Sequence, residues 1–341
     1  MPRHYLVTGG AGFIGSNYVH RLVQRGEKVT VYDNLSRGGS LRNLDWLKET
    51  FGDGAFNMIA GDTRDAALLI DAARDADVII HLAGQVAVTT SVTDPRDDFE
   101  SNALGTFNAL EAARHSERNP IFIYSSTNKV YGGMEDVELV EDATRWRYKD
   151  LVNGCPETQP LDFHSPYGCS KGTGDQYVRD YSRIYGLRSV VFRQSCIYGP
   201  RQFGVEDQGW VAWFIIAAVT GRPMTVFGDG KQVRDILNVD DLMNAYDAAV
   251  EKIDIASGRV YNMGGGPQNV MSVWAEFGPI LERLLEEKIE VGHGDWRPGD
   301  QRVFYADISK AEQELGWTPK IGVEEGIRRL FIWVKENRNL F

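Results

Sequence analysis

Short apolar runs alternate with longer amphipathic segments along the first half of the chain. The apolar runs are typical of buried strands and read HYLVTGG, KVTVYDN, FNMIAGD, DVIIHLAG, PIFIYSS and RSVVFRQS. Between them lie amphipathic segments with a helical pattern, such as 13–25, 65–74 and 99–115. Strands that alternate with helices build a doubly wound parallel sheet with right-handed crossovers, so we predict an α/β, Rossmann-type fold.

The pattern becomes irregular after the stretch YGPRQ. A tryptophan-rich helix is predicted near 208–220, followed by a turn at FGDGKQ and a helical tail. We expect a smaller, mixed α/β C-terminal lobe, with the chain returning to the large sheet near RDILNVDDL and RVYNMGGG. The predicted division assigns 1–196 and 234–263 to the sheet domain, and 197–233 and 264–341 to the lobe.

Composition and charge narrow the classes of partner. A chain of 341 residues with 43% hydrophobic residues can bury a sizeable core. The formal net charge of −11, without a dense run of lysine and arginine, argues against a nucleic-acid surface and against an anionic membrane surface. An anionic ligand is therefore expected to meet a few well-placed arginines.

The cysteines and the N-terminus favour a reducing compartment. Cys155, Cys169 and Cys196 form neither a disulfide framework nor a CxxC metal site, and we predict no metal. The N-terminus runs directly into a strand pattern, without the basic and apolar regions of a secretory signal, and no apolar run reaches about 20 residues. We expect a cytoplasmic protein.

A glycine-rich turn follows the first predicted strand. In VTGGAGFIGS, Gly9, Gly12 and Gly15 precede and begin the first helix, where the backbone can approach a pyrophosphate and the helix N-terminus favours an anion. The second strand ends at Asp33, whose carboxylate could accept both ribose hydroxyls of an adenosine and repel a 2′-phosphate. NAD is therefore favoured over NADP, although Arg37 could soften this preference.

Tyr167 and Lys171 form a YxxxK pair in SPYGCSK. Pro166 indicates that a helix begins here, which would bring both side chains to one face at positions i and i+4. The ammonium is expected to lower the pKa of the phenol from about 10 towards the working pH, so that the tyrosinate could take a proton from a hydroxyl group. Such a pair can also be a solvated surface feature.

The order of these motifs resembles one enzyme family. The chain resembles, over essentially its whole length, the extended short-chain dehydrogenase/reductases that modify nucleotide sugars. The motifs that carry this resemblance are the glycine loop, Asp33, HLAG, YSSTNKVYG, YxxxK and YGPRQ. The resemblance implies an NAD-binding Rossmann domain and a C-terminal lobe that holds a nucleoside diphosphate. Thr127 matches the family's catalytic Ser/Thr, Tyr167 its base and Lys171 its cofactor-anchoring lysine.

The resemblance also implies two sets of binding residues. The cofactor would contact Gly9, Gly12, Phe13, Ile14, Gly15, Asp33, Asn34, Ser36, Arg37, Asp62, Leu82, Ala83, Gly84, Tyr167 and Lys171. The substrate would contact Gln85, Asn128, His164, Cys196, Arg201, Gln208, Arg234 and Arg297. Asp62 could equally cap a helix, whereas Arg234 and Arg297 are expected on the diphosphate because a planar guanidinium matches phosphate oxygens.

The pair Asn128-Lys129 bears on the reaction. Family members that eliminate water across C5 and C6 of a sugar usually carry Asp-Glu directly after the catalytic threonine, where this chain has no carboxylate. Dehydration is therefore disfavoured, and oxidation followed by re-reduction of one carbon remains. HLAGQVAVTTS, SSTNKVYG, LDFHSPYGCSKG and DQGW further resemble the CDP-paratose 2-epimerases, a subfamily that converts CDP-paratose to CDP-tyvelose through a 2-ketosugar with bound NAD.

Other interpretations stay open at this point. The same three catalytic residues would serve a UDP-sugar 4-epimerase, whereas a non-catalytic NAD-binding sensor would need only the glycine loop and Asp33. Cys196 departs from the wider family, in which many members have a substrate-facing asparagine. The segment 134–163 could close over the sugar or remain a solvated loop. By resemblance, helices in 99–115 and 167–185 would pair two copies into a homodimer.

Overall fold

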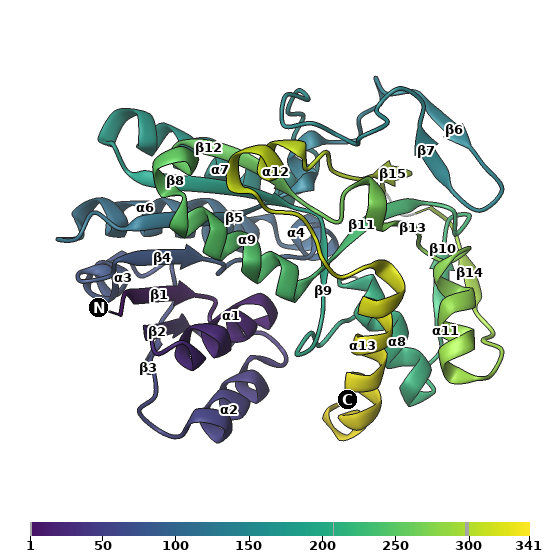
Figure 1. Cartoon of the computed structure of the whole chain (residues 1–341), viewed down its shortest axis with the longest axis horizontal. Coiled ribbons are helices and arrows are strands. Elements are labelled where there is room, and N and C mark those ends of the chain that lie inside the picture. The colour runs from purple at the N-terminus through teal and green to yellow at the C-terminus, as the bar shows by residue number, and fades with distance from the viewer. Residues whose placement is uncertain (1, 207, 297–299) are drawn as a thin grey trace.

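A seven-stranded sheet forms the centre of the computed structural model, which describes residues 2–206, 208–296 and 300–341 (Figure 1). The strand order is β12-β8-β5-β4-β1-β2-β3, and every neighbouring pair is parallel. The strands are β1 His4–Thr8, β2 Lys28–Asp33, β3 Asn57–Ala60, β4 Val78–His81, β5 Ile121–Thr127, β8 Arg188–Gln194 and β12 Arg259–Met263. All six predicted apolar runs are therefore strands of one parallel sheet, and the predicted fold class is confirmed.

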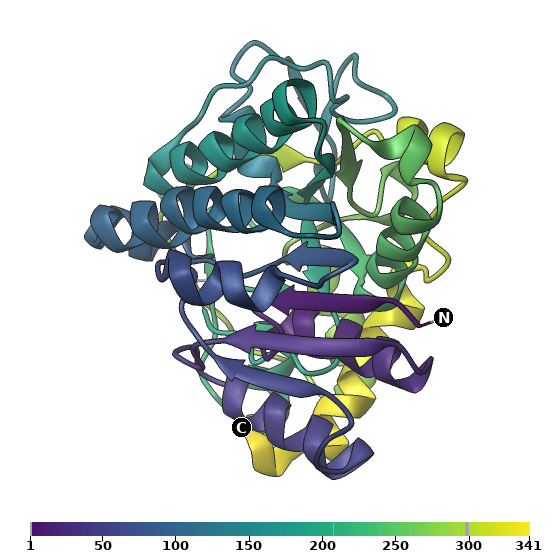
Figure 2. The same ribbon diagram turned by 90° about the vertical axis from the view of Figure 1, so that its left-hand side faces the viewer.

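Helices cover both faces of this sheet (Figure 2). One face packs against α1 Phe13–Gln24, α2 Ser40–Phe51, α9 Val239–Glu251 and α12 Ser309–Leu315, and the other against α3 Ala66–Ala73, α6 Gly105–His115 and α7 Ser165–Tyr185. Neighbouring strand residues alternate between the two cores: Val7 and Val31 lie in the first, Leu6 and Tyr32 in the second. Because both faces are buried, the strands appear in the sequence as continuous apolar runs.

The C-terminal lobe is built on two small sheets (Figure 1). One contains β9 Cys196–Tyr198, β11 Val233–Asn238, β13 Val270–Ser272 and β15 Val303–Phe304, and the other contains β10 Thr225–Phe227 and β14 Gly292–Gly294. The helices α8 Trp210–Thr220, α11 Phe277–Leu285 and α13 Val323–Glu336 share an apolar core with this lobe.

The two segments predicted to return to the large sheet differ in how they do so. β12 joins that sheet beside β8, as expected, but β11 does not: it pairs with β9, β13 and β15 in the lobe. Within RDILNVDDL, β11 is therefore not a strand of the large sheet, but α9, which begins at VDDL, packs against that sheet. The predicted domain boundaries stay a prediction. All six residues of β11 are buried, as in a central strand, so its pattern indicates burial without indicating which sheet the strand joins.

Segment 134–163 is attached to the lobe. It contains the hairpin of β6 Leu139–Glu141 and β7 Trp146–Tyr148. Trp146 Nε1 donates to Asp229 Oδ2 at 2.7 Å, and Lys231 Nζ lies 2.9 Å from Glu141 Oε1. These contacts join the hairpin to the turn that connects β10 to β11.

Short elements complete the connections. They are α4 Val88–Thr93, α5 Pro95–Phe99, a π-helix at Glu100–Leu104, α10 Ile253–Ala256 and 3-10 turns at Asn128–Tyr131, Pro267–Asn269 and Arg338–Leu340. In the described part of the chain, no helix is long and apolar enough to cross a membrane.

A buried ion pair joins α7 to the sheet. Arg193 on β8 donates from Nε and Nη2 to the two carboxylate oxygens of Asp175 at 2.8 and 3.0 Å, and both side chains are almost fully buried. Asp175 Oδ2 also accepts from Ser126 Oγ on β5 at 2.9 Å. One carboxylate therefore fixes α7 against β5 and β8.

Removal of this carboxylate is expected to destabilise the fold. Asp175→Ala leaves the Arg193 guanidinium buried and unpaired, which should lower the free energy of unfolding by about 3–5 kcal/mol in urea titrations. Asp180→Ala on the same helix is the control, because Asp180 is 58% exposed and its ion pair with Arg183 spans 3.9 Å. The control should change stability by less than about 1 kcal/mol. Equal losses in the two variants would contradict the assignment.

Candidate active site

A cavity of about 710 Å³ lies at the carboxyl ends of the central strands and extends to the lobe. Asp33 at the end of β2, Ala83 after β4 and Thr127 at the end of β5 line it from the sheet. Cys196 on β9 and Trp210 on α8 line it from the lobe. Open parallel sheets bind ligands in this crevice outside the strand ends, so the cavity is the candidate active site.

The glycine loop forms one wall, and its glycines are needed for close packing. Gly9 has a φ of +68°, and a Cβ there would lie 2.8 Å from Ala83 N. A Cβ on Gly15 would lie 2.1 Å from the Gly9 carbonyl oxygen. Gly12 is the N-cap of α1, and no described side chain caps this end of the helix. Gly12, Phe13, Ile14 and Gly15 at this helix end line the cavity, and their uncapped N–H groups fit the pyrophosphate of a dinucleotide.

Asp33 links β2 to the glycine loop. Its Oδ2 accepts from Ala11 N at 3.0 Å and its Oδ1 from Leu35 N at 2.8 Å. Burial raises the pKa of Asp33, while these backbone donors act in the opposite direction. Each carboxylate oxygen keeps a second lone pair for a ribose hydroxyl.

The other predicted cofactor residues lie in the same cavity. Phe13, Ile14, Asn34, Ser36, Arg37, Asp62, Leu82 and Gly84 all line the cavity together with the glycines and Asp33. Asp62 is paired with Arg64 at 2.7 Å, and this hydrogen bonding lowers the pKa of Asp62 to about 2. Asp62 does not cap α3, because Asp65 is the N-cap of that helix.

Thr127, Tyr167 and Lys171 also line the cavity. Thr127 ends β5, whereas Tyr167 and Lys171 lie one turn apart in the first turns of α7. All three side chains are buried, at 6%, 9% and 6% exposure. Lys171 Nζ lies 4.4 Å from the ring centroid of Tyr124, so its stem fills the space between α7 and β5.

The pKa of Tyr167 differs from the expectation. Burial raises it to about 12, a hydrogen bond with Thr127 lowers it, and Lys171 is not among the groups that shift it. The prediction that Lys171 lowers this pKa is therefore wrong for this structure. Burial also lowers the pKa of Lys171 to about 7, because desolvation disfavours each charged form.

Two carboxylates act against the effect of desolvation on the pKa of Lys171. The charges of Asp98 and Asp175 both raise its pKa. Asp98 is fully buried; its Oδ2 accepts from Ser170 Oγ at 2.6 Å, and its Oδ1 accepts from the Asn102 amide at 3.0 Å. Gln85 Nε2 also donates to Asp98 at 3.0 Å. This network holds the residue next to Lys171 and favours the protonated amine.

The predicted substrate residues divide into two groups. Gln85, Asn128, Cys196 and Gln208 line the cavity. Arg201, Arg234 and His164 do not line it, and Arg297 lies outside the described residues.

Two of the predicted arginines have partners within the protein. The guanidinium carbon of Arg201 lies 4.1 Å from the Trp46 ring centroid and 5.6 Å from that of Trp333. Arg234 is 7% exposed and donates from Nη2 to Asp300 Oδ1 at 2.7 Å. Their assignment to the substrate stays a prediction.

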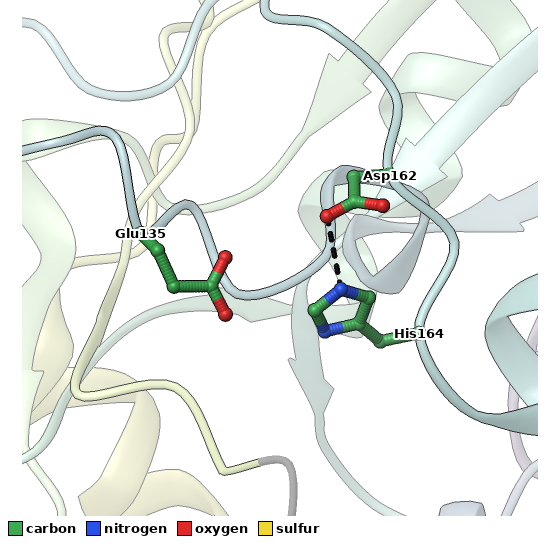
Figure 3. Close-up of side chains that lie close together, drawn as sticks. All are labelled: Glu135, Asp162 and His164. Carbon is green, nitrogen blue, oxygen red and sulfur yellow. Dashed lines mark ion pairs between the residues drawn. The ribbon is translucent and has the colours of Figure 1, made fainter.

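His164 belongs to an exposed cluster with Glu135 and Asp162 (Figure 3). Its Nε2 lies 2.9 Å from Asp162 Oδ2, and one ligand atom from each of the three residues lies within 4.8 Å of the others. The cluster lies outside the cavity. Its shortest contact is the ion pair between His164 and Asp162. No residue of 134–163 lines the cavity, so closure over a sugar is not seen in this structure.

Sequence reasoning missed several lining residues. They include Ser125, Ser126, Lys129, Gln194, Ser195, Gln202 and Trp210. Lys129 directly follows the predicted Asn128, and Trp210 is the last residue of the motif DQGW, so the sequence motifs could have indicated both. Gln202 likewise ends the motif YGPRQ. Gln194 had no comparable signal, because its position depends on how β8 packs beside the cavity.

Comparison with known proteins agrees with this geometry. The model of a protein family described as GDP-mannose 4,6 dehydratase matches residues 6–330. The chain belongs to this family. It is 44% identical to CDP-paratose 2-epimerase of Salmonella typhi, across 96% of this chain and 98% of that protein. The predicted resemblance to extended short-chain dehydrogenase/reductases and to this epimerase is confirmed.

Solved structures of family relatives superpose closely. UDP-glucose 4-epimerase of Thermotoga maritima with UDP-glucose has a TM-score of 0.84 at 31% identity, covering 98% of this chain and 99% of that one. A dTDP-glucose 4,6-dehydratase of Streptomyces venezuelae with bound NAD has a TM-score of 0.84 at 28% identity, covering 99% and 98%. Epimerases and dehydratases thus share this fold, so the fold alone does not select the reaction.

The shifted pKa of Lys171 predicts a pH-dependent stability. Because its folded pKa is about 7, the unfolded chain binds more protons than the native protein between about pH 7 and 10. Lys171→Met removes this difference, so the wild-type free energy of unfolding should rise with pH relative to the variant, by up to about 1.4 kcal/mol per pH unit. Urea unfolding at several pH values measures this; a difference that falls or stays flat would contradict the assignment. The exposed Lys48→Met is the control.

Proposed function

We propose that the protein is an NAD-dependent nucleotide-sugar epimerase that inverts C2 of a CDP-linked dideoxyhexose, converting CDP-paratose to CDP-tyvelose. The observation that carries the proposal is the 44% identity to CDP-paratose 2-epimerase over nearly the whole of both chains. The cavity supports it, because Thr127, Tyr167 and Lys171 line it. The next two positions, Asn128 and Lys129, carry no carboxylate for dehydration.

The residues around the glycine loop and Asp33 fit NAD. The uncapped N-terminus of α1 would bind the pyrophosphate, and Asp33 would accept from the ribose hydroxyls. A carboxylate at this position disfavours the 2′-phosphate of NADP. When bound, NAD supplies the acceptor for the C2 hydride, adds a positive charge to the cavity in its oxidised form and returns the hydride to the other face.

Tyr167 would be the acid and base of the reaction. Its phenolic oxygen would accept the proton of the C2 hydroxyl and later return it, while Thr127 would hydrogen-bond the same oxygen. Burial and the charge of Asp98 oppose the tyrosinate, whereas the hydrogen bond with Thr127 and the charge of Arg37 favour it. The positive charge of the oxidised cofactor would favour it further. Asp98 and Asp175 favour the charged form of Lys171, which would anchor the cofactor.

Inversion also requires an anchored nucleotide. The 2-ketosugar must turn between the two hydride transfers, so the diphosphate has to stay bound while the sugar is loosely held. Arg234 is the arginine predicted for the diphosphate. Its charge acts on the lining residues Lys129 and Cys196, but its guanidinium is paired with Asp300 and does not itself line the cavity.

The second candidate is a UDP-sugar 4-epimerase. The 31% identity and close superposition with UDP-glucose 4-epimerase of Thermotoga maritima favour it as the alternative. Incubation with a panel of CDP- and UDP-sugars, followed by NMR of the products, separates the two activities.

A cytoplasmic homodimer is proposed for the assembly. Phe107, Tyr177, Ile184 and Tyr185 expose 39–66% of their surface along α6 and α7, and Phe99 precedes them on α5. Such a patch on neighbouring helices is typical of a subunit interface. Three unpaired cysteines are consistent with a reducing compartment.

The role of Tyr167 can be tested by removing its hydroxyl. Tyr167→Phe keeps the ring but loses the proton acceptor, so turnover of CDP-paratose should fall by ~100-fold or more. NAD affinity, measured by calorimetry, should change little. Tyr177→Phe is the control, because this tyrosine lies on the same helix and is 46% exposed. Near-normal turnover in Tyr167→Phe would remove the residue from its role.

The fate of the C2 hydrogen tests the reaction type. In D2O, the product should have the mass of the substrate and carry no deuterium at C2, whereas substrate deuterated at C2 should keep its label after inversion. Mass spectrometry and NMR measure both. Solvent deuterium at C2 would indicate deprotonation next to a carbonyl group, and loss of water would indicate dehydration; either result would overturn the proposed mechanism.

A further inference from the structure

Lys129 lines the cavity together with the proposed catalytic residues, but the mechanism above gives it no role. It follows Thr127 by two residues, in the 3-10 turn Asn128–Tyr131. Thr127 Oγ1 caps this turn by accepting from Lys129 N at 3.2 Å. The hydroxyl proposed to contact the reacting oxygen therefore also fixes the backbone of Lys129. Both residues line the same cavity.

The ammonium of Lys129 has no carboxylate partner among the described residues. Its one hydrogen bond is to a neutral amide, Gln301 Oε1, at 3.3 Å. Asp300 is close enough to raise its pKa, but this carboxylate is hydrogen-bonded to Arg234 at 2.7 Å. Arg234 on β11 and the desolvation of Lys129 both act in the other direction and lower its pKa to about 8. Cys196 on β9 is the remaining titratable neighbour that shifts this pKa.

Gln301 orients this ammonium without saturating it. Its Nε2 donates to the Gly132 carbonyl, which fixes the amide, and its Oε1 accepts from Lys129 Nζ and, at 3.5 Å, from Asn128 Nδ2. An ammonium carries three N–H donors, and Gln301 uses one of them. The side chain is half-buried and lines the cavity, and its other two donors have no partner among the residues that the structure describes, so they can reach a ligand there.

We propose that Lys129 is a substrate-contacting residue that donates a hydrogen bond to an oxygen of the sugar near the reacting carbon. The proposal rests on the proposed function in assuming a nucleotide-sugar ligand. A sugar oxygen fits better than the diphosphate, because Lys129 is fixed to Thr127, the residue proposed to contact the reacting oxygen. The contact places a positive charge where elimination would need a carboxylate, and it favours developing negative charge on an oxygen.

Binding of CDP with and without the sugar tests the proposal. Lys129→Met keeps the length of the side chain but removes its charge and its donors. In the NAD-loaded protein, the variant should bind CDP within about twofold of the wild type. Its kcat/KM for CDP-paratose should fall roughly 10- to 100-fold, the usual effect of losing a hydrogen bond from a charged group.

Lys231→Met is the matched control. It removes the same charge from a lysine that lies outside the cavity and pairs with Glu141 at 2.9 Å, so CDP binding and kcat/KM should stay near wild type. An equal loss of CDP affinity and of kcat/KM in Lys129→Met would show a phosphate contact and overturn the proposal. Unchanged kcat/KM would overturn it as well.

Measurements on the wild-type protein decide the question if Lys129→Met does not fold. As pH rises through about 8, Lys129 loses its charge, so KM for the nucleotide sugar should rise while the affinity for CDP stays constant. In Lys129→Arg the guanidinium stays charged, and the rise should disappear. A parallel weakening of CDP, or no rise in KM, would contradict a sugar contact.

The proposed function can fail independently. If the wild type does not convert CDP-paratose, the 2-epimerase proposal is wrong, and the same comparison is made with whichever nucleotide sugar of the panel binds. A loss of affinity in Lys129→Met that is confined to the sugar-bearing ligand would still support the contact, and an unchanged affinity would still exclude it.

Discussion

The buried carboxylate of Asp175 is the interaction on which the site depends. It accepts from Ser126 on β5 and from Arg193 on β8, while it is itself part of α7. The strand that ends at Thr127 and the helix that carries Tyr167 are therefore held at a fixed separation by one group. The same charge raises the pKa of Lys171. A structural ion pair and the electrostatics of the site thus share one side chain.

The two amines of the site are held in opposite ways. Lys171 is desolvated but faces two buried carboxylates, whereas Lys129 is hydrogen-bonded to an amide and its nearest carboxylate is paired with Arg234. A buried charge without a counter-ion is unfavourable in the folded protein. Such an arrangement is typical of positions that have been shaped by a ligand, because the ligand supplies the missing partner.

Most of the large sheet could be predicted from the sequence, because parallel strands buried on both faces leave continuous apolar runs. The glycine loop, Asp33 and the YxxxK pair were also readable, since each consists of neighbouring residues on one element. The sequence did not indicate that the strand RDILN joins the sheet of the lobe, because a buried apolar run does not specify which strands pair with it. The partners of Arg201 are Trp46 and Trp333, and the partner of Arg234 is Asp300. The sequence did not indicate these contacts, because the partners are far away in the chain. The pKa of Tyr167 depends on burial, which local spacing does not report.

The pairing of β11 has a mechanical consequence. β11 is hydrogen-bonded to β9, which follows β8 after a single residue, and it leads directly into α9, which packs with α1. The lobe is thus joined to the sheet through paired backbone rather than through a free linker. Hinges need residues whose φ and ψ can change freely, and paired strand residues lack this freedom. Ligand exchange is therefore expected to depend on local movements of surface loops, with the two halves keeping a nearly constant orientation throughout the catalytic cycle.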